Sequence, residues 1–307
     1  MKKCILIITT ITCFSGMLFS QIEPTVEMMK FYTPEWNGER DAGGRPIVPD
    51  ELLDRLINLS LEEAWGVLRG EGYHNQFEGG WEMIHADQPF VGRALTVQYM
   101  PTRPEINKQI MDLGKEQGRI GASNSWPIDM LRERDVYVAD GFGKVFNGTL
   151  IGDNLGNSIY AKSKTGVVFD AGARDLEGLS KIEGFNAFVR GFDPTFIMEM
   201  MVTEINSPIR VGQATVVPGD VVLAKREGVI FIPAHLVQKV VITGEFIALR
   251  DQFGHEMLRK GVYTPGQIDT QWTEEIKSAF IKWLDENEES LPMSREELDE
   301  YMKTRTW

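Results

Sequence analysis

Three side chains within the stretch IGDNLGNSIYAKSKTGVVFDAGARD have the types needed to bind a divalent cation and an organic anion. Asp153 is separated by 20 residues from the adjacent pair Arg174 and Asp175. Carboxylate oxygens are the ligands that hard cations prefer, and a guanidinium presents a planar pair of donors that matches a carboxylate. The sequence therefore predicts a metal and oxyanion site, provided that the fold brings both ends of this stretch together.

The residues between the two ends predict the elements that would do so. Residues 154–163 have the pattern of a helix, and residues 166–169 have the pattern of a buried strand, so the chain leaves one edge of a sheet and returns to it. The backbone amides of Asn154 and Leu155 would then lie at a helix start, where free N–H groups favour a substrate carboxylate. In the simpler alternative, Asp153 only caps the helix, and Arg174 and Asp175 form a salt bridge at a strand end.

The rest of the chain predicts an α/β fold with a helical end. Residues 21–48 mix Pro, Gly, Trp and charge without periodicity, which indicates an extended arm. Helices are expected from Asp50, from the capping box at Ser60, and over 105–118, 234–258, 273–287 and 294–303. Strands are expected over 92–99, 135–139, 187–190, 209–211, 214–217, 221–224 and 229–232.

The first twenty residues predict an exported protein. Two lysines precede an apolar run that is too short for a stable membrane span, and small residues precede Gln21, as in a cleaved secretory signal. A retained anchor is the alternative. Both cysteines, Cys4 and Cys13, lie in this segment, so the mature protein would have no thiol, no disulfide and no stable span. A periplasmic or secreted location follows.

The charge of the chain argues against nucleic acid as a partner. The formal net charge is −13, and loss of Lys2 and Lys3 with the signal would make it −15. Nucleic-acid binding depends on basic side chains that neutralise phosphates, so an acidic protein is poorly suited to it. A small-molecule partner is the better expectation.

Three motifs, GVVFDAGARD, GFNAFVRG and PGDVVLAKREGVIFIP, occur in this order. With them, the chain resembles the family of RraA-type ribonuclease regulator-like proteins and 4-hydroxy-4-methyl-2-oxoglutarate aldolases. The resemblance covers roughly residues 88–245, between a signal at 1–20 with an N-terminal region at 21–87 and a C-terminal helical extension at 246–307. It implies a swivelling β/β/α core, assembly into homotrimers or hexamers, and active sites at subunit interfaces.

The resemblance also implies roles for the three side chains. Aldolase members carry an Asp, 20 residues, and then Arg-Asp, whereas regulator-type members typically lack the first aspartate. By this resemblance, Asp175 ligates Mg²⁺, Mn²⁺ or another divalent cation, Asp153 holds a water of that metal, and Arg174 clamps the pyruvyl group. Aldolase members also use a glutamate of a neighbouring subunit, for which Glu227, Glu245 and Glu256 are the candidates here.

The expected function is that of a metal-dependent carbon–carbon lyase. Cleavage of a 4-hydroxy-2-oxo acid to pyruvate and a second carbonyl compound, and decarboxylation of oxaloacetate, both pass through a pyruvate enolate that needs electrostatic stabilisation. Lys144, just after a buried strand, is a candidate for substrate contact, with a Schiff base as a lesser alternative. Gly141 to Gly143 do not extend to a dinucleotide motif.

Two other functions remain open from the sequence. One is a non-catalytic binding protein that regulates a partner. The other is a lyase or isomerase acting on a sugar-derived acid, because Trp81, Asn124 and Trp126 lie in segments that the aldolase resemblance does not explain. Core packing of the two tryptophans is the simpler interpretation.

Overall fold

The computed structural model describes residues 22–304, so the predicted signal segment with Cys4 and Cys13 lies outside the described residues. A nine-stranded sheet forms the centre, in the order β1-β11-β10-β3-β4-β5-β6-β2, with β7 also paired to β3. The strands are β1 (Phe77–Glu78), β2 (Glu82–Met83), β3 (Phe90–Pro101), β4 (Asp135–Thr149), β5 (Val167–Ala173), β6 (Ala187–Phe192), β7 (Met200–Ile205), β10 (Val221–Lys225) and β11 (Gly228–Ile232). A separate hairpin consists of β8 (Ile209–Val211) and β9 (Ala214–Val216).

The four strands β3, β4, β5 and β6 are parallel neighbours, and the remaining pairings in the sheet are antiparallel. The edge of β3 that does not face β4 pairs with two strands. Strand β10 pairs with the first residues of β3, and β7 pairs with the last. Every residue of β5 is buried, as expected for a parallel strand covered on both faces. The carboxyl ends of β4 and β5 therefore lie side by side.

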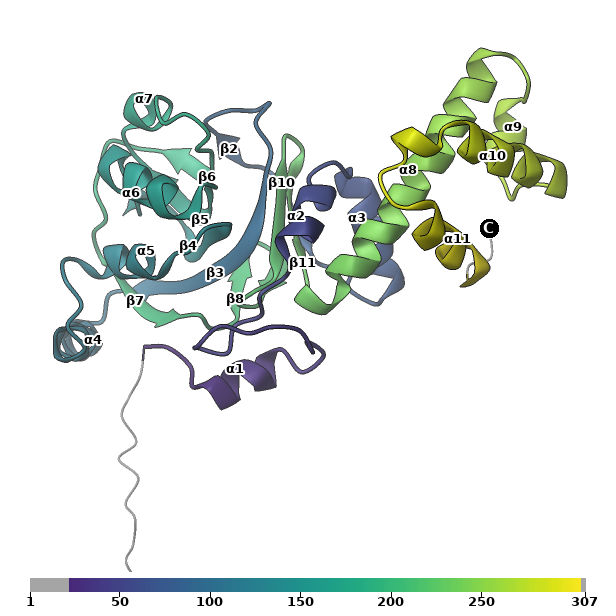
Figure 1. Ribbon diagram of the computed structural model, residues 1–307. Helices are drawn as coiled ribbons and strands as arrows, with labels where there is room; N and C mark the ends of the chain where they lie inside the picture. The colour runs from purple at the N-terminus through teal and green to yellow at the C-terminus, as the bar shows by residue number, and fades with distance from the viewer. Residues whose placement is uncertain (1–21, 305–307) are drawn as a thin grey trace, which may run out of the picture.

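The helices are α1 (Val26–Tyr32), α2 (Asp50–Leu56), α3 (Leu61–Gly70), α4 (Pro104–Glu116), α5 (Trp126–Met130), α6 (Asp153–Ser163), α7 (Leu176–Leu179), α8 (Val237–Arg259), α9 (Pro265–Ile268), α10 (Glu274–Glu286) and α11 (Arg295–Thr304). Figure 1 shows α6 and α7 together on one side of the parallel strands, whereas α1 lies on the opposite side of the molecule and α8 leads away to the last helices. Short 3₁₀ turns precede α5 and α8 and follow α10.

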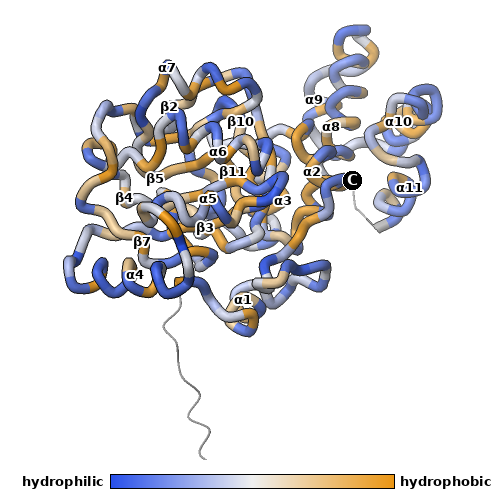
Figure 2. Tube along the Cα trace, turned by 60° about the vertical axis from the view of Figure 1, so that its left-hand side comes forward, coloured by the Kyte–Doolittle hydropathy of each residue, from blue (hydrophilic) through white to orange (hydrophobic). Residues whose placement is uncertain are grey.

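The two faces of the parallel strands bury different clusters. One face packs Leu95, Tyr137 and Phe169 against side chains of α5, α6 and α7, and the other packs Val136 and Val168 against the β8–β9 hairpin. In Figure 2 the hydrophobic colour follows β3 and β5 through the interior, while the outer loops are hydrophilic. Both faces are thus closed, and the ends of the strands remain available for function.

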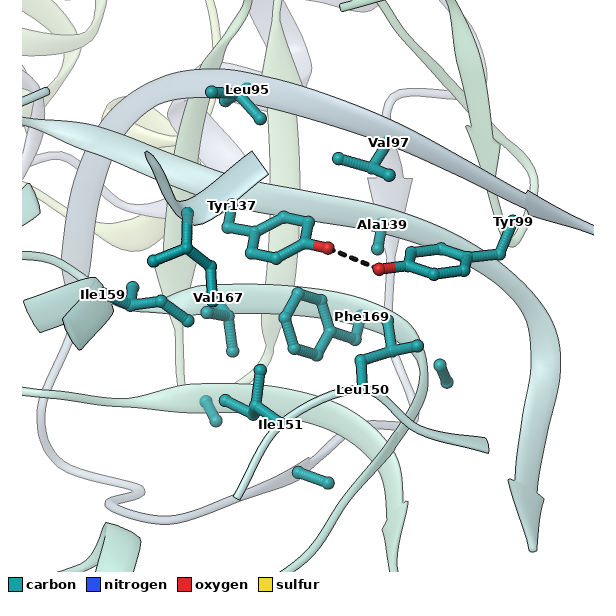
Figure 3. Packing of buried hydrophobic residues seen from close by; sticks show 14 of the residues in the cluster. Leu95, Val97, Tyr99, Tyr137, Ala139, Leu150, Ile151, Ile159, Val167 and Phe169 are labelled. Carbon is teal, nitrogen blue, oxygen red and sulfur yellow. Dashed lines mark hydrogen bonds between the residues drawn. The ribbon is translucent and has the colours of Figure 1, made fainter. Parts of the chain in front are cut away.

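A pair of tyrosines lies inside the first cluster. The hydroxyls of Tyr99 and Tyr137 are 2.7 Å apart, both side chains are buried, and the ring of Tyr137 meets Phe169 edge-on at 4.8 Å between centroids (Figure 3). Burial raises the pKa of both tyrosines, so each stays neutral and the two hydroxyls satisfy each other. Leu150 and Ile151, which lead to Asp153, pack in the same cluster.

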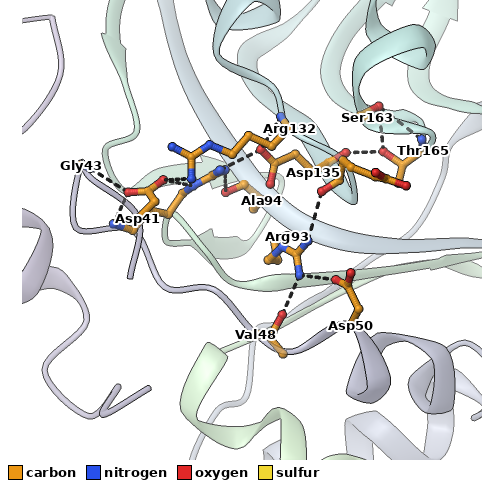
Figure 4. Close-up of polar contacts among 12 residues, drawn as sticks. Asp41, Gly43, Val48, Asp50, Arg93, Ala94, Arg132, Asp135, Ser163 and Thr165 are labelled. Atoms are coloured by element: carbon orange, nitrogen blue, oxygen red, sulfur yellow. Dashed lines mark hydrogen bonds and ion pairs between the residues drawn. The ribbon is translucent and has the colours of Figure 1, made fainter. Parts of the chain in front are cut away.

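The arm, residues 22–48, is fixed to the core by a buried ion pair. The guanidinium of Arg45 donates to Asp135 at 2.7 Å and to Asp41 at 3.3 Å, and the surrounding polar contacts are drawn in Figure 4. Arg93 of β3 likewise donates to the carbonyl of Val48 at 2.6 Å. These contacts anchor a segment that has few buried apolar side chains of its own.

The α/β prediction is confirmed, and several element boundaries are reproduced closely. Ser60 and Glu63 form the predicted capping box, and the helix after Asp153 ends at Ser163 as expected. The arm was predicted to be extended, but it contains the helix α1. The only buried side chain of α1 is Met29, so this helix has no apolar stripe. The strand predicted to end before Asp140 continues to Thr149 through two bulges, and β7 was not predicted.

The C-terminal helices form a separate cluster of aromatic and aliphatic side chains. Phe253, Phe280 and Trp283 pack together there, and Trp272 joins them. The helix α8 runs unbroken through the boundary expected at 245/246, so it belongs to both regions. Among residues 22–304, no helix combines the length and apolar character needed to cross a membrane.

Candidate active site

Two backbone hydrogen bonds bring the ends of the sequence motif together. The amide of Leu150 donates to the carbonyl of Gly172 at 2.9 Å, and the amide of Arg174 donates to the carbonyl of Ile151 at 3.0 Å. The segment before α6 therefore runs alongside the end of β5 and its continuation. This pairing places Asp153, the first residue of α6, next to the Arg174–Asp175 turn, as the sequence predicted.

Two glycines show how closely the carboxylates approach the neighbouring backbone. A Cβ added at Gly152 would lie 2.2 Å from Oδ2 of Asp175, and one added at Gly178 would lie 2.7 Å from Oδ2 of Asp153. Each carboxylate thus packs against the backbone of the segment that carries the other. Asp175 itself has a left-handed backbone, with φ 57°, which turns the chain sharply from β5 into α7.

The charged groups of the site are exposed enough to meet a ligand. Arg174 Nη1 lies 3.3 Å from Asp175 Oδ2, and the two side chains are 41% and 35% exposed. The salt bridge of the simpler alternative therefore exists. An exposed ion pair of this kind contributes little to stability, so both groups can rearrange around a bound ligand at small cost.

A small cavity adjoins the guanidinium. Its volume is about 90 Å³, and its walls come from residues 149–152, from Asn154 and Leu155, from Arg174, and from Asn124, Phe196 and Ile197. The side chains of Asp153 and Asp175 do not line it. Asn124 is held by a 2.8 Å hydrogen bond from its side-chain amide to the carbonyl of Leu150. Phe196 and Ile197 follow β6 in a loop that carried no recognisable motif, so sequence reasoning missed them.

One backbone amide at the start of α6 already has a hydrogen-bond partner. The amide of Asn154 donates to Oδ1 of Asp153 at 2.8 Å, so a substrate carboxylate at this amide would have to replace that contact. Leu155 lies in the same first turn, whose N–H groups have no carbonyl one turn before them. Both residues line the cavity.

The other candidates lie further away. Lys144 pairs with Glu199 at 3.2 Å and does not line the cavity. Trp81 and Trp126 are buried in core clusters and do not line it either.

The three candidates for the glutamate of a neighbouring subunit differ in their contacts and exposure. Glu245 is buried in an ion pair with Arg55 at 2.6 Å, and Glu256 contacts Lys260 and Trp283. Glu227 is exposed at a turn. Of these three side chains, Glu227 is therefore the only one that is exposed.

The side chains present fit a hydrated magnesium or manganese ion. Within residues 22–304, no three His, Cys, Asp or Glu side chains are arranged to hold a metal on their own. Mg²⁺ keeps several waters and commonly binds one or two carboxylates together with substrate oxygens. Asp175 and Asp153 supply such a pair, with substrate and water left to complete the coordination.

The family model described as RraA-like, Aldolase/RraA, matches residues 60–231. The chain belongs to the RraA-like family. This match confirms the predicted family, which includes aldolases as well as non-catalytic regulators. All the cavity residues lie within the matched segment.

Known relatives show the same core. Protein DlpA of Legionella pneumophila is 25% identical over 203 residues, which are 65% of this chain but only 30% of DlpA. RraAS2 of Streptomyces coelicolor, described as an unusual member of the RNase ES inhibitor RraA protein family, superimposes with a TM-score of 0.55 at 22% identity, over 70% of this chain and 98% of its own. An uncharacterized protein from Pseudomonas syringae gives 0.58 at 21% identity, over 73% and 100%. These likenesses confirm the RraA-like core fold.

Proposed function

We propose that this protein is a divalent-metal-dependent lyase that cleaves a 4-hydroxy-2-oxo acid into pyruvate and a second carbonyl compound, and that it also decarboxylates oxaloacetate. The observation that carries the proposal is the convergence of Asp153, Arg174 and Asp175 beside the start of α6, where Arg174 also lines a small cavity. A structural salt bridge alone would need neither the second carboxylate nor the glycines that make room for both.

Both reactions need the same stabilisation. In the retro-aldol reaction the bond between C3 and C4 breaks, the C4 hydroxyl loses its proton to become a carbonyl, and the electron pair passes to C3 and the C2 oxygen. Arg174 donates to the substrate's carboxylate and C2 oxygen, where negative charge develops. A bound Mg²⁺ or Mn²⁺ supplies further Lewis-acid stabilisation of that oxygen. Protonation of C3 then gives pyruvate.

The two aspartates have separate tasks in this proposal. Asp175 holds the cation, and Asp153 orients a water that accepts the C4 hydroxyl proton, because no histidine lines the cavity. The carboxylate of Asp153 is already aligned by the amide of Asn154. The Leu155 amide binds the substrate carboxylate, and Lys144 is an outer contact for the part of the substrate beyond C4.

The surface around the site supports assembly into homotrimers or hexamers. Phe142 and Phe146 on the bulged part of β4, Leu176 on α7, and Phe196 and Met198 in the loop after β6 are large apolar side chains that are exposed. A concentration of this kind is typical of protein–protein contact surfaces. We also propose export, from the lysines and apolar run of residues 1–20.

The test is metal-dependent pyruvate release from a panel of 4-hydroxy-2-oxo acids and oxaloacetate, with and without a chelator. Activity that requires the metal and is lost in Asp175→Ala supports the proposal. Asp87→Ala is the matched control, because Asp87 is an exposed aspartate that does not line the cavity. Metal-independent turnover would refute the mechanism. Capture of a protein partner without cleavage of any oxo acid would favour the regulatory alternative.

A further inference from the structure

A second and larger cleft lies between the arm and the loops that flank β9, β10 and β11. One cavity of about 400 Å³ extends from Tyr32 to Asp220, and an adjoining cavity of about 310 Å³ reaches Gln238. The two share Glu35, Trp36, Ala234 and His235 and form one elongated cleft. Neither shares a residue with the cavity at Arg174, so this cleft is independent of the proposed lyase site.

The cleft presents a fixed aromatic surface at its middle. The indole N–H of Trp36 donates to the carbonyl of Glu39 at 2.8 Å. A Cβ added at Gly38 would lie 2.4 Å from the Trp36 ring, so the ring rests on the glycine backbone. Tyr73 lines the first cavity, with its hydroxyl 3.4 Å from Nε2 of His235. Aromatic side chains held in this way lose little conformational freedom when a ligand stacks on them.

The charge of the cleft excludes anions. Glu35 and Asp220 line the first cavity, and none of the described residues that line either cavity is a lysine or arginine. Burial raises the pKa of Tyr73, and the charges of Asp220, Glu35 and Glu71 raise it further. The local potential is therefore negative, in contrast to the cavity at Arg174. An oxo acid or a phosphate would be repelled here.

We propose that this cleft binds a neutral oligosaccharide. Trp36 and Tyr73 offer flat apolar faces for the C–H faces of sugar rings. Sugar hydroxyls can donate to Glu35 and can accept from the side-chain amide of Asn75 or the ring of His74. Two cavities joined at Trp36 suit a ligand longer than one ring, and their volumes lie within the roughly 300–1,000 Å³ typical of small-molecule sites.

The experiment is calorimetric titration of the mature full-length protein with neutral hexasaccharides of β-1,4-glucan, α-1,4-glucan and β-1,4-xylan. An oligogalacturonate serves as the anionic comparison and spermidine as the cationic one. We expect at least one neutral hexasaccharide to bind, and the oligogalacturonate not to bind. Trp36→Ala should weaken binding by about tenfold or more, and Trp36→Phe, which keeps a ring on Gly38, by less.

Trp65→Ala is the matched control, because Trp65 is an exposed tryptophan on α3 outside the cleft. It should leave sugar affinity unchanged, and circular dichroism of each variant checks folding. Failure of all three hexasaccharides to bind at about 5 mM would overturn the proposal. Tight binding of spermidine that Glu35→Gln abolishes would instead identify a cation site. If the native protein binds a sugar but releases no pyruvate from any oxo acid, that result would contradict the lyase proposal alone.

Discussion

The two proposed binding regions of this molecule differ in charge and in their relation to the family match. The cavity at Arg174 is small, carries a guanidinium, and consists entirely of residues within the family match at 60–231. The cleft at Trp36 is larger and acidic, and it depends on arm residues 32–38 and on residues 233–238, which lie outside that match. The arm's helix α1 and the helix α7 lie on opposite sides of the molecule (Figures 1 and 2).

This difference shows how residues outside a shared core can form a cavity whose charge differs from that of the core's own cavity. The arm reaches the core mainly through polar contacts, so it can form one wall of a cleft without altering the sheet. The strands that hold Arg174, by contrast, are packed on both faces. Substitutions that affect one region should therefore leave the other nearly unchanged.

Arg45→Met should give the largest effect on stability. It leaves the buried carboxylate of Asp135 without its guanidinium partner, so the free energy of unfolding should fall by about 3–5 kcal/mol. Urea denaturation measures the change. Arg132→Ala is the matched control, because Arg132 meets Asp41 only at 3.5 Å and is exposed; it should cost less than about 1 kcal/mol. Equal effects of the two variants would contradict the anchoring role of the buried pair.

Asp220→Asn should change how stability depends on pH. Burial raises the pKa of Asp220 from 3.8 to about 7, so the folded state holds a proton that the unfolded state releases. The stability of the native protein should therefore fall as pH rises between about 4 and 7, by up to about 4 kcal/mol at about 1.4 kcal/mol per pKa unit. The Asp220→Asn variant has no carboxyl group at this position, so its stability should lack this dependence on pH. A difference between the two unfolding free energies that stays constant from pH 4 to pH 8 would be inconsistent with a raised pKa.

Gly152→Ala should impair the lyase site and spare the cleft. The added methyl group would lie 2.2 Å from Oδ2 of Asp175 and must displace that carboxylate. We expect kcat/KM for pyruvate release to fall about 10–100-fold, because misplaced catalytic groups lose much of their effect. Gly66→Ala, in α3 with open space around it, is the control and should stabilise the helix by roughly 0.5–1 kcal/mol. Full activity in Gly152→Ala would mean that Asp175 does not need its present position.

Lys144→Ala should have the smallest effect. Its ammonium group pairs with Glu199 at the surface and does not line the cavity, so we expect less than about a fivefold change in kcat/KM. Borohydride treatment of the native enzyme with substrate should cause no inactivation. Covalent trapping at Lys144 would replace the metal-assisted mechanism with a Schiff-base mechanism.

The sequence was informative where local patterns determine structure. The helix after Asp153, the buried strand before Arg174 and the capping box at Ser60 follow from hydrophobic periodicity and helix-end chemistry. Their order also predicted that the motif's two ends would meet. The hydrogen bonds that align these ends could not be predicted, because they join backbone atoms of Ile151 and Arg174 rather than characteristic side chains.

Features formed by distant segments were not accessible from the sequence. The cleft joins residues 32–36, 72–76, 215–220 and 233–235, and none of these segments has a binding motif by itself. Strand β7 pairs with the far half of β3, which local alternation does not reveal. Helix α1 leaves Met28 and Phe31 exposed, so no apolar stripe marked it as a helix.

The central claim is that Arg174 and the two aspartates together hold a pyruvate enolate. Oxalate, a planar dianion, resembles that enolate, so calorimetric titration of oxalate in the presence of Mn²⁺ tests the claim most directly. We predict metal-dependent binding that weakens at least about 100-fold in Arg174→Ala, and not in Arg226→Ala, which alters an exposed arginine away from the cavity. Oxalate binding that needs no Mn²⁺, or that is unchanged in Arg174→Ala, would contradict the account.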